Sequence, residues 1–226
     1  MYSGITQGLF VVKSVIKHKN LFHYCVVLNE KLVKDLQVGA SIAVDGVCQT
    51  VVAINGIEVS FDAIQETLTR TTLNDLFVGR KVSIERSVRY GEEMGGHELS
   101  GHIFETGQII DKKISENNLA LTIHCSKACF AFIKPKAYIA LDGSSLTVGL
   151  TDKKEYCFEV YLIPETLRKT NFSNKDCGDK VNIEPDMKTM MLVESIQNYF
   201  SNINARLTNL EKQFKEIMNE KNINLE

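Results

Sequence analysis

The chain has no large excess of charge of either sign and no long apolar run. Its 26 basic and 28 acidic residues among 226 give a net charge of -2, so it lacks the electrostatic footprint of a protein that binds nucleic acid or an anionic membrane surface. No apolar stretch approaches the roughly 18 residues of a membrane span, and residues 1–5 lack the basic and apolar regions of a secretory signal. We therefore expect no nucleic-acid partner, no membrane partner and a cytoplasmic location.

The six cysteines form no CxxC pair in a chain that is long enough to bury a core, which favours reduced thiols. Cys125 and Cys129 could share one face of a helix, but no second pair of ligands follows them, so we predict no metal site there. The sequence also contains neither a Rossmann glycine fingerprint nor a P-loop. We therefore expect no bound cofactor.

What the sequence does contain is an internal repeat. Ser3-Gly4 matches Ser100-Gly101 at the start of each copy. Three further segments recur in the same order, at an offset of 97 residues for the first pair and 99 for the other two: 45–51 with 142–148, 66–71 with 165–170, and 79–85 with 178–184. The repeat predicts two related domains, over residues 1–97 and 98–188, followed by a tail over 189–226.

Within each copy the segments are short and rich in Val, Ile and Thr, as in 40–44, 57–61 and 81–85, and Asp-Gly or Asn-Gly turns lie beside them. This pattern is typical of antiparallel strands. Five or six strands in ~90 residues must hide their edges, and closure into a small barrel does so. We therefore predict an all-β fold of two tandem barrels. Tandem β-sandwiches that serve only for binding are the alternative.

Beyond residue 188 the apolar residues follow a heptad pattern, spaced alternately by three and four. The seam residues are Val193, Ile196, Phe200, Ile203, Leu207, Leu210, Phe214 and Ile217. Leu at an a-type position, Ile at d-type positions and two Phe at a-type positions favour a core wider than that of a dimer. The tail therefore favours a coiled coil of three or four strands, of which a trimer is our expectation, and a single amphipathic helix packed on its own subunit is the alternative.

Three segments together resemble the riboflavin synthase family of the α-chain type: Asp45-Gly-Val-Cys-Gln-Thr-Val51, Gly95-Gly-His-Glu-Leu-Ser-Gly-His102 and Asp142-Gly-Ser-Ser-Leu-Thr-Val148. The likeness covers about residues 1–190. It implies two closed six-stranded Greek-key barrels per subunit and a homotrimer. Each barrel would bind one 6,7-dimethyl-8-ribityllumazine, and two such molecules would be converted to riboflavin and 5-amino-6-ribitylaminouracil between barrels of adjacent subunits. Association with lumazine synthase stays open.

The resemblance also implies the substrate-binding residues. Those expected at the N-terminal barrel are Gly4, Ile5, Thr6, Cys48, Gln49, Thr50, Asp62, Ala63, Ile64, Gln65, Glu66, Thr67, Gly101, His102 and Ile103. Those expected at the C-terminal barrel are Lys136, Ser145, Leu146, Thr147, Tyr161, Leu162, Ile163, Pro164 and Glu165. In a strand, Cys48 and Thr50 would point to one face and Gln49 to the other. Glu66 and Glu165 would accept hydrogen bonds from ribityl hydroxyls, although turn-capping acids would recur equally well.

Five residues are candidates for the chemistry. His102 and then His97 are the first choices for proton transfer, because an imidazole titrates near neutral pH. A buried structural histidine is the alternative for each. Cys48 and Ser145 occupy equivalent positions with unlike groups, which suits donor and acceptor roles, and Cys48 is otherwise a packing residue. Asp186 is a hydrogen-bonding candidate whose alternative is a surface carboxylate.

The segment from His97 to His102 is not a zinc motif, because its histidines are five residues apart instead of four. The sequence departs from the family pattern at Tyr2-Ser3, where Phe-Thr is usual, and at Gln49, where an apolar residue is usual. Two other functions stay open. One is a non-catalytic lumazine- or flavin-binding antenna protein, and the other is a coiled-coil interaction protein with a β-rich head.

Overall fold

The computed structural model of the chain describes residues 1–115 and 118–220, and only the backbone of residues 217–220. The predicted seam residue Ile217 therefore lies outside the residues whose side chains are described. Within the described ranges, no helix is long and apolar enough to cross a membrane.

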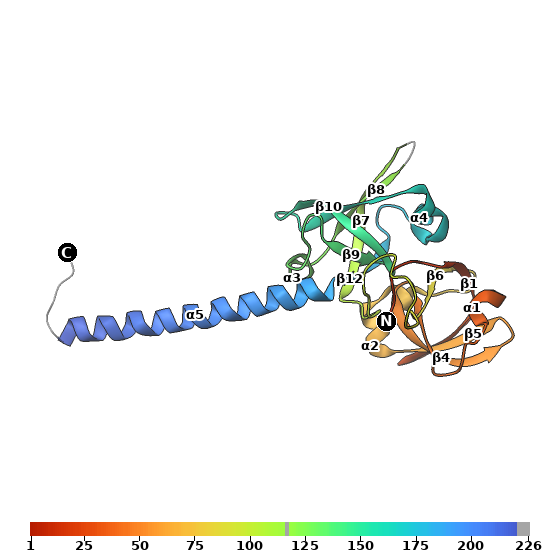
Figure 1. Cartoon of the computed structure of the whole chain (residues 1–226), viewed down its shortest axis with the longest axis horizontal. Coiled ribbons are helices and arrows are strands. Elements are labelled where there is room, and N and C mark those ends of the chain that lie inside the picture. The colour runs from red at the N-terminus through yellow and green to blue at the C-terminus, as the bar shows by residue number, and fades with distance from the viewer. Residues whose placement is uncertain (116–117, 221–226) are drawn as a thin grey trace. The chain divides into compact units, whose positions relative to one another are not determined.

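The first copy of the repeat folds into a closed antiparallel barrel (Figure 1). Its strands are β1 (Gly8–His18), β2 (Leu21–Val27), β3 (Ser41–Val44), β4 (Val47–Asn55), β5 (Glu58–Ile64) and β6 (Lys81–Arg86). Its short helices are α1 (Glu30–Val33), α2 (Gln65–Arg70) and the 3-10 turn η1 (Thr72–Asp75). The strand order β1-β2-β5-β4-β3-β6 contains the Greek-key arrangement, since β5, which follows β3 and β4 along the chain, returns to lie beside β2.

The second copy repeats this barrel element by element. Its strands are β7 (Glu105–Ile114), β8 (Leu119–His124), β9 (Tyr138–Leu141), β10 (Ser144–Asp152), β11 (Cys157–Leu162) and β12 (Lys180–Pro185). Its helices are α3 (Lys127–Phe130), α4 (Pro164–Lys169) and the 3-10 turn η2 (Asn171–Asn174). The prediction of two closed six-stranded barrels is confirmed.

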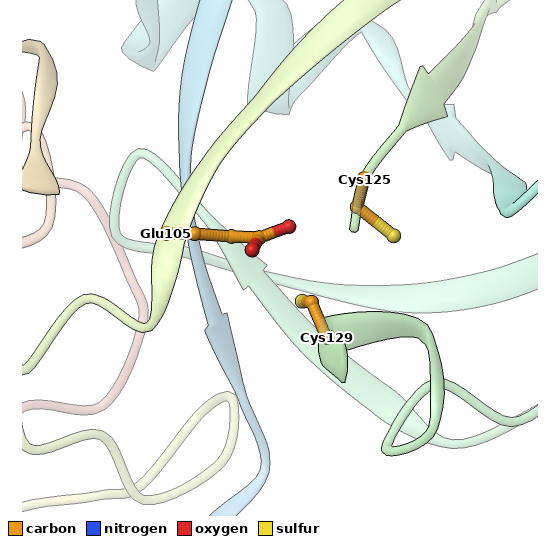
Figure 2. Close-up of side chains that lie close together, drawn as sticks. All are labelled: Glu105, Cys125 and Cys129. Atoms are coloured by element: carbon orange, nitrogen blue, oxygen red, sulfur yellow. The ribbon is translucent and has the colours of Figure 1, made fainter. Parts of the chain in front are cut away.

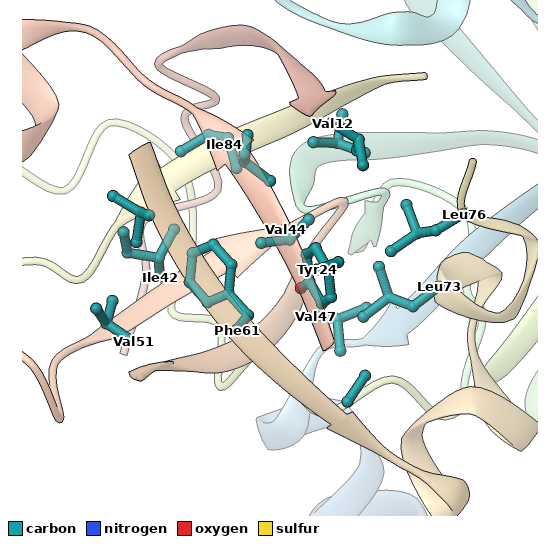
Figure 3. Close-up of a cluster of buried hydrophobic side chains, with 14 of the residues drawn as sticks. Val12, Tyr24, Ile42, Val44, Val47, Val51, Phe61, Leu73, Leu76 and Ile84 are labelled. Atoms are coloured by element: carbon teal, nitrogen blue, oxygen red, sulfur yellow. The ribbon is translucent and has the colours of Figure 1, made fainter. Parts of the chain in front are cut away.

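Each barrel has its own apolar core. In the first barrel, inward side chains from several strands meet those of the η1 segment, as Tyr24, Phe61, Ile84 and Leu73 show (Figure 3). A corresponding cluster fills the second barrel. The equivalent strands β4 and β10 carry the same alternation of buried and exposed residues, so the two copies agree in register as well as in strand order.

The barrels contact each other through their Asp-Gly turns. Asp45, Gly46, Asp142 and Gly143 all have positive φ, between 44° and 80°, as a two-residue hairpin turn with Asp-Gly at its centre requires. A Cβ on Gly46 would lie 2.4 Å from the backbone nitrogen of Gly143. Only glycine therefore permits this close approach of the two backbones.

The two turn aspartates are completely buried at this junction. Asp45 accepts hydrogen bonds from Ser83 N at 2.7 Å and Arg80 Nη2 at 2.8 Å, and Asp142 pairs with Lys175 Nζ at 3.1 Å. Burial, and then the nearby charge of Asp142, raise the pKa of Asp45 to about 6. The junction therefore contains a carboxyl group that titrates well above its ordinary range.

The C-terminal helix α5 (Met187–Glu220) belongs to a compact unit separate from residues 1–186. The part of the tail that the structure describes is thus helical, as its heptads predict. Its seam side chains are largely exposed within one chain, with Phe200 at 58%, Leu207 at 51% and Phe214 at 54% of their full exposure.

Candidate functional site

Two buried glutamates hold the starts of the two copies. Ser3 donates from its backbone nitrogen and its hydroxyl to Glu85 Oε1, both at 2.7 Å, and Gly4 N donates to Oε2 at 3.1 Å. Ser100 makes the same pair of 2.7 Å bonds to Glu184. Burial raises the pKa of both carboxyl groups, although these serine bonds act in the opposite direction. Each copy's start is thereby fixed to the last strand of its own barrel.

The first residues of each copy then extend to a strand of the other barrel, which is β10 for the first copy and β4 for the second. Ser145 N donates to Gly4 O at 2.8 Å, and Cys48 N donates to Gly101 O at 2.9 Å. Both glycines have positive φ, +75° and +77°, and an added Cβ would lie 2.5 Å from Ser145 Cβ or 2.7 Å from Cys48 Cβ respectively. These positions require glycine on conformational and on steric grounds.

The contact between the first residues of each copy and the other barrel corrects one expectation from the sequence. Gly4–Thr6 were grouped with the N-terminal barrel, but Gly4 contacts Ser145, and Thr6 Oγ1 lies 3.0 Å from Ser144 Oγ, so they lie beside the C-terminal barrel. The expected grouping of Gly101 with Cys48 agrees with the structure. The repeat made Gly4 and Gly101 equivalent, but it did not show which barrel each segment contacts.

On β4 and β10, alternate residues face outward from the barrel. In β4, Cys48 is half-buried and Thr50 is exposed, whereas Gln49 turns into the barrel, where Tyr24 Oη donates to its Oε1 at 3.2 Å. In β10, Ser145 and Thr147 point outward in the same way and Leu146 is buried. The predicted division of Cys48 and Thr50 from Gln49 is confirmed, because the Gln49 side chain lies on the inner face of the strand.

The neighbouring strands supply a second row of outward residues. The exposed members are Asp62 and Ile64 in the first copy, and Tyr161 and Ile163 in the second. Ala63 and Leu162 turn inward instead and are completely buried. Lys136, in the loop before β9, has an exposed side chain, and its backbone nitrogen donates to Val148 O at 2.9 Å.

The two repeated glutamates lie in the short helices that follow these strands. Gln65, Glu66 and Thr67 begin α2, and Pro164 and Glu165 begin α4. Glu66 pairs with Arg70 at 3.3 Å, and Glu165 pairs with Arg168, in both cases within its own helix. Local helix pairing therefore accounts for both carboxylates, and their predicted contact with ribityl hydroxyls stays a prediction.

The equivalent residues Cys48 and Ser145 have unlike partners. Tyr2 Oη donates to Cys48 Sγ at 3.2 Å, whereas His97 Nδ1 lies 2.6 Å from Ser145 Oγ. The His97 ring stacks on Tyr138 with centroids 4.9 Å apart. Burial, and then the bond to Cys48, raise the pKa of Tyr2 well above its ordinary value, so its hydroxyl stays protonated and acts as a donor.

The remaining two candidates lie near the anchors. The His102 side chain is exposed, and its backbone nitrogen donates to Ser100 Oγ at 3.1 Å. Asp186 is half-buried and follows β12 two residues after Glu184. The structure thus brings His102 to the Cys48 side of the junction through Gly101, and His97 to the Ser145 side.

Sequence reasoning missed three polar residues at the site. Glu85 and Glu184 end the third recurring segment, and their recurrence was the available signal. His23 was given no role, yet its Nδ1 lies 2.7 Å from Asp62 Oδ1 on the outer face of the first barrel. Its partner lies across a strand pair, so no local spacing could indicate it.

Comparisons with known proteins agree with this architecture. Residues 3–87 and 100–186 each match the lumazine binding domain. The chain is 40% identical over 198 residues to the riboflavin synthase of Buchnera aphidicola subsp. Baizongia pistaciae, and 39% identical to that of Escherichia coli K12, covering 87% of this chain and 92% of each relative. The structure of LumP complexed with riboflavin matches with a TM-score of 0.76 and 25% identity, covering 82% of this chain and 99% of LumP.

Proposed function

This chain belongs to the riboflavin synthase family, and from that premise we propose that it converts two molecules of 6,7-dimethyl-8-ribityllumazine into riboflavin and 5-amino-6-ribitylaminouracil. A four-carbon unit passes from one molecule to the other, so the two products together contain all the atoms of the two substrates. The observation that carries the proposal is the pair of equivalent but unlike outward residues, Cys48 on β4 and Ser145 on β10, on a chain that is 40% identical to a riboflavin synthase over 198 residues.

Each pocket combines residues of both barrels. In the N-terminal pocket, Cys48, Thr50, Asp62 and Ile64 face outward beside the Gly101–Ile103 segment. In the C-terminal pocket, Ser145, Thr147, Tyr161 and Ile163 occupy the equivalent positions beside Gly4–Thr6. We assign one lumazine to each, with Lys136 at the second. Because the two pockets are related by duplication, two facing copies would present their ligands in opposed orientations.

The chemistry needs little beyond alignment and proton handling. The C7 methyl group of the substrate is acidic because its carbanion is delocalised into the ring. Holding two reactants in a productive orientation is worth about 7–11 kcal/mol in favourable cases. We assign proton transfer to His102 and to the His97–Ser145 pair, and carbanion or adduct stabilisation to Cys48 and Asp186.

The active assembly is proposed to be a homotrimer held by α5. The supporting observation is a 34-residue helix whose heptad side chains, including Phe200 and Leu207, are about half exposed within a single chain. Two further copies of the same helix would bury this seam. Catalysis would then occur where the N-terminal barrel of one subunit meets the C-terminal barrel of another. The division into residues 1–97, 98–188 and 189–226, a cytoplasmic location and an association with lumazine synthase belong to the same proposal.

One alternative has a specific observation in its favour. The fold similarity to LumP in complex with riboflavin fits a protein that binds one chromophore without turnover. Against it stands the chain's close likeness to riboflavin synthases together with two pockets that both keep polar outward residues.

A single assay tests the proposal. Purified protein is mixed with 6,7-dimethyl-8-ribityllumazine in buffer alone, and riboflavin absorbance and release of 5-amino-6-ribitylaminouracil are followed together. We expect the two products in equal amounts without any added cofactor. Tight binding of lumazine with no product would establish the chromophore-binding alternative and refute the enzyme.

A further inference from the structure

Two thiols and a carboxylate converge in the C-terminal barrel, away from both pockets. Cys125 follows β8, Cys129 lies in α3 and Glu105 begins β7. Their ligand atoms all lie within 4.8 Å of one another, and Figure 2 shows the three side chains close together. Both thiols are buried, and Glu105 is half-buried.

Backbone geometry fixes the three residues in place. Ser126 caps α3 by accepting a hydrogen bond from Cys129 N at 3.1 Å, and its own nitrogen donates to Glu105 Oε1 at 2.6 Å. Cys125 N donates to Tyr156 O at 3.0 Å. One capping residue thus orients the carboxylate and the second thiol together, so the convergence does not depend on the ends of flexible side chains.

The first barrel shows what these positions contain when only packing is required. Leu28 N donates to Ile57 O just as Cys125 N donates to Tyr156 O, which makes Leu28 the equivalent of Cys125.

The capping bond identifies the second pair, because Asn29 Oδ1 accepts from Leu32 N as Ser126 Oγ accepts from Cys129 N. Gly8 pairs with Ile84 as Glu105 pairs with Ile183. The second copy thus has two soft ligands and an anion where the first copy has two buried leucines and no side chain.

We propose that Cys125, Cys129 and Glu105 bind a soft divalent cation of the Zn²⁺ type, with a solvent molecule as the fourth ligand. Thiolates and a carboxylate are common zinc donors, with Zn–S about 2.3 Å and Zn–O about 2.0–2.2 Å. Tetrahedral coordination at those lengths separates the donor atoms by about 3.3–3.8 Å, so only a small inward shift is needed. Each thiol gives up its proton on binding, and affinity therefore falls as the pH is lowered.

The metal would act as a clamp and not as a catalyst. Glu105 lies two residues after Ile103, the last residue of the segment that reaches Cys48. A cation bound at Glu105 would thus fix the chain where it leaves the N-terminal pocket and enters β7. The sequence alone led us to predict no metal site at Cys125 and Cys129, because Glu105 is 20 residues from Cys125 and no spacing rule connects them.

The test uses the full-length protein, reduced and stripped of metal, titrated with Co²⁺ alone. We expect one equivalent to bind with thiolate-to-cobalt absorption in the near ultraviolet and tetrahedral bands in the visible, and Zn²⁺ to displace it. Cys129→Ser and Glu105→Gln should each weaken binding by about 10-fold or more. Cys177→Ser, which changes an exposed thiol, is the matched control and should leave the affinity unchanged.

A second variant keeps the test decisive if the serine variant fails to fold. Cys125→Leu/Cys129→Leu places the first barrel's residues in the second, so we expect it to fold, as circular dichroism checks, and to lose the cobalt spectrum. Equal Co²⁺ binding by this variant and the wild type would overturn the proposal. So would an absorption band that disappears in Cys177→Ser, or a reduced wild type that binds no Co²⁺.

Discussion

Tyr2 donates a hydrogen bond to Cys48 within the first copy of the repeat, with 3.2 Å between Oη and Sγ. The ring of Tyr2 is buried, and it also lies close to Gly101. The first residues of the chain therefore form part of the wall behind the N-terminal pocket. Removing the Tyr2 hydroxyl alone, with the buried ring left in place, is therefore a selective probe of that wall.

Tyr2→Phe should weaken lumazine binding at the N-terminal pocket by about 2- to 10-fold, the range expected for one neutral hydrogen bond. Fluorescence titration with lumazine measures this, and urea unfolding measures the accompanying loss of stability. Tyr24→Phe is the control, because it removes an equivalent bond to Gln49 inside the barrel. If both variants change stability but neither changes binding, Tyr2 has only a packing role.

Gly4→Ala and Gly101→Ala should each impair one pocket selectively. Gly4→Ala forces a Cβ against Ser145, and Gly101→Ala forces one against Cys48, so each should lose one of two lumazine sites and about 1–3 kcal/mol of unfolding free energy. Gly39→Ala is the control for backbone strain alone, since its φ is +88° and its Cβ would meet nothing within 4 Å. Binding stoichiometry gives the number of lumazine sites that each variant keeps. Loss of both sites in either variant would contradict the assignment of one glycine to each site.

His97→Asn keeps a donor near Ser145 but removes the imidazole ring. If the His97–Ser145 pair transfers protons, kcat should fall by about 100-fold or more while lumazine binding changes little. His124→Asn, at an exposed histidine at the end of β8, is the control. Near-normal turnover in His97→Asn would show instead that the imidazole only positions the serine hydroxyl.

The raised pKa of Asp45 predicts that the stability of the protein depends on pH. Its pKa rises from 3.8 to about 6 on folding, so its contribution to stability is complete below pH 4 and is lost as the pH rises through 6. Asp45→Asn lacks this dependence. The stability of the wild type relative to Asp45→Asn should therefore decrease between pH 4 and 7, as urea unfolding at several pH values would measure. A constant difference would mean that Arg80 and Lys175 keep Asp45 ionised throughout.

Charges on the α5 seam should separate the subunits. Phe200→Glu/Leu207→Glu places two carboxylates in the proposed trimer core, so we expect monomers by light scattering that still bind lumazine but turn over at least about 100-fold more slowly. Asn202→Glu, on the same helix away from the seam, should remain trimeric and active. Ending the chain at Leu192 should reproduce the monomer. Full activity in a monodisperse monomer would refute an active site between subunits.

Much of the fold could be predicted from sequence because its determinants are local. The Asp-Gly turns at 45–46 and 142–143 and the strand over 81–85 appear close to their expected positions. The heptads of the tail predicted a helix, and α5 is one. These features depend on residues that are neighbours in sequence, where propensity and periodicity carry the information.

The site was harder to predict from sequence than the fold, because its contacts join residues that are distant in sequence. Cys48 and Ser145 could be matched by the repeat, but their partners Tyr2 and His97 lie 46 and 48 residues away. The contact of Gly4 with the opposite barrel depends on how two domains pack, and a repeat alone does not specify that packing.

Because the first residues of each copy contact the other barrel, neither barrel has all of its contacts when it is made alone. A protein made of one copy, ending at residue 97, would retain Cys48 but lack Gly101, which completes the pocket beside it. Its own Gly4 would be left without Ser145 as a donor. Two such half-proteins could pair so that the start segment of each contacts the barrel of the other. The arrangement of the fused chain therefore corresponds to a symmetric dimer joined into one polypeptide. In a single chain the two halves need not be identical, and this chain has a thiol at Cys48 in one half and a hydroxyl at Ser145 in the other.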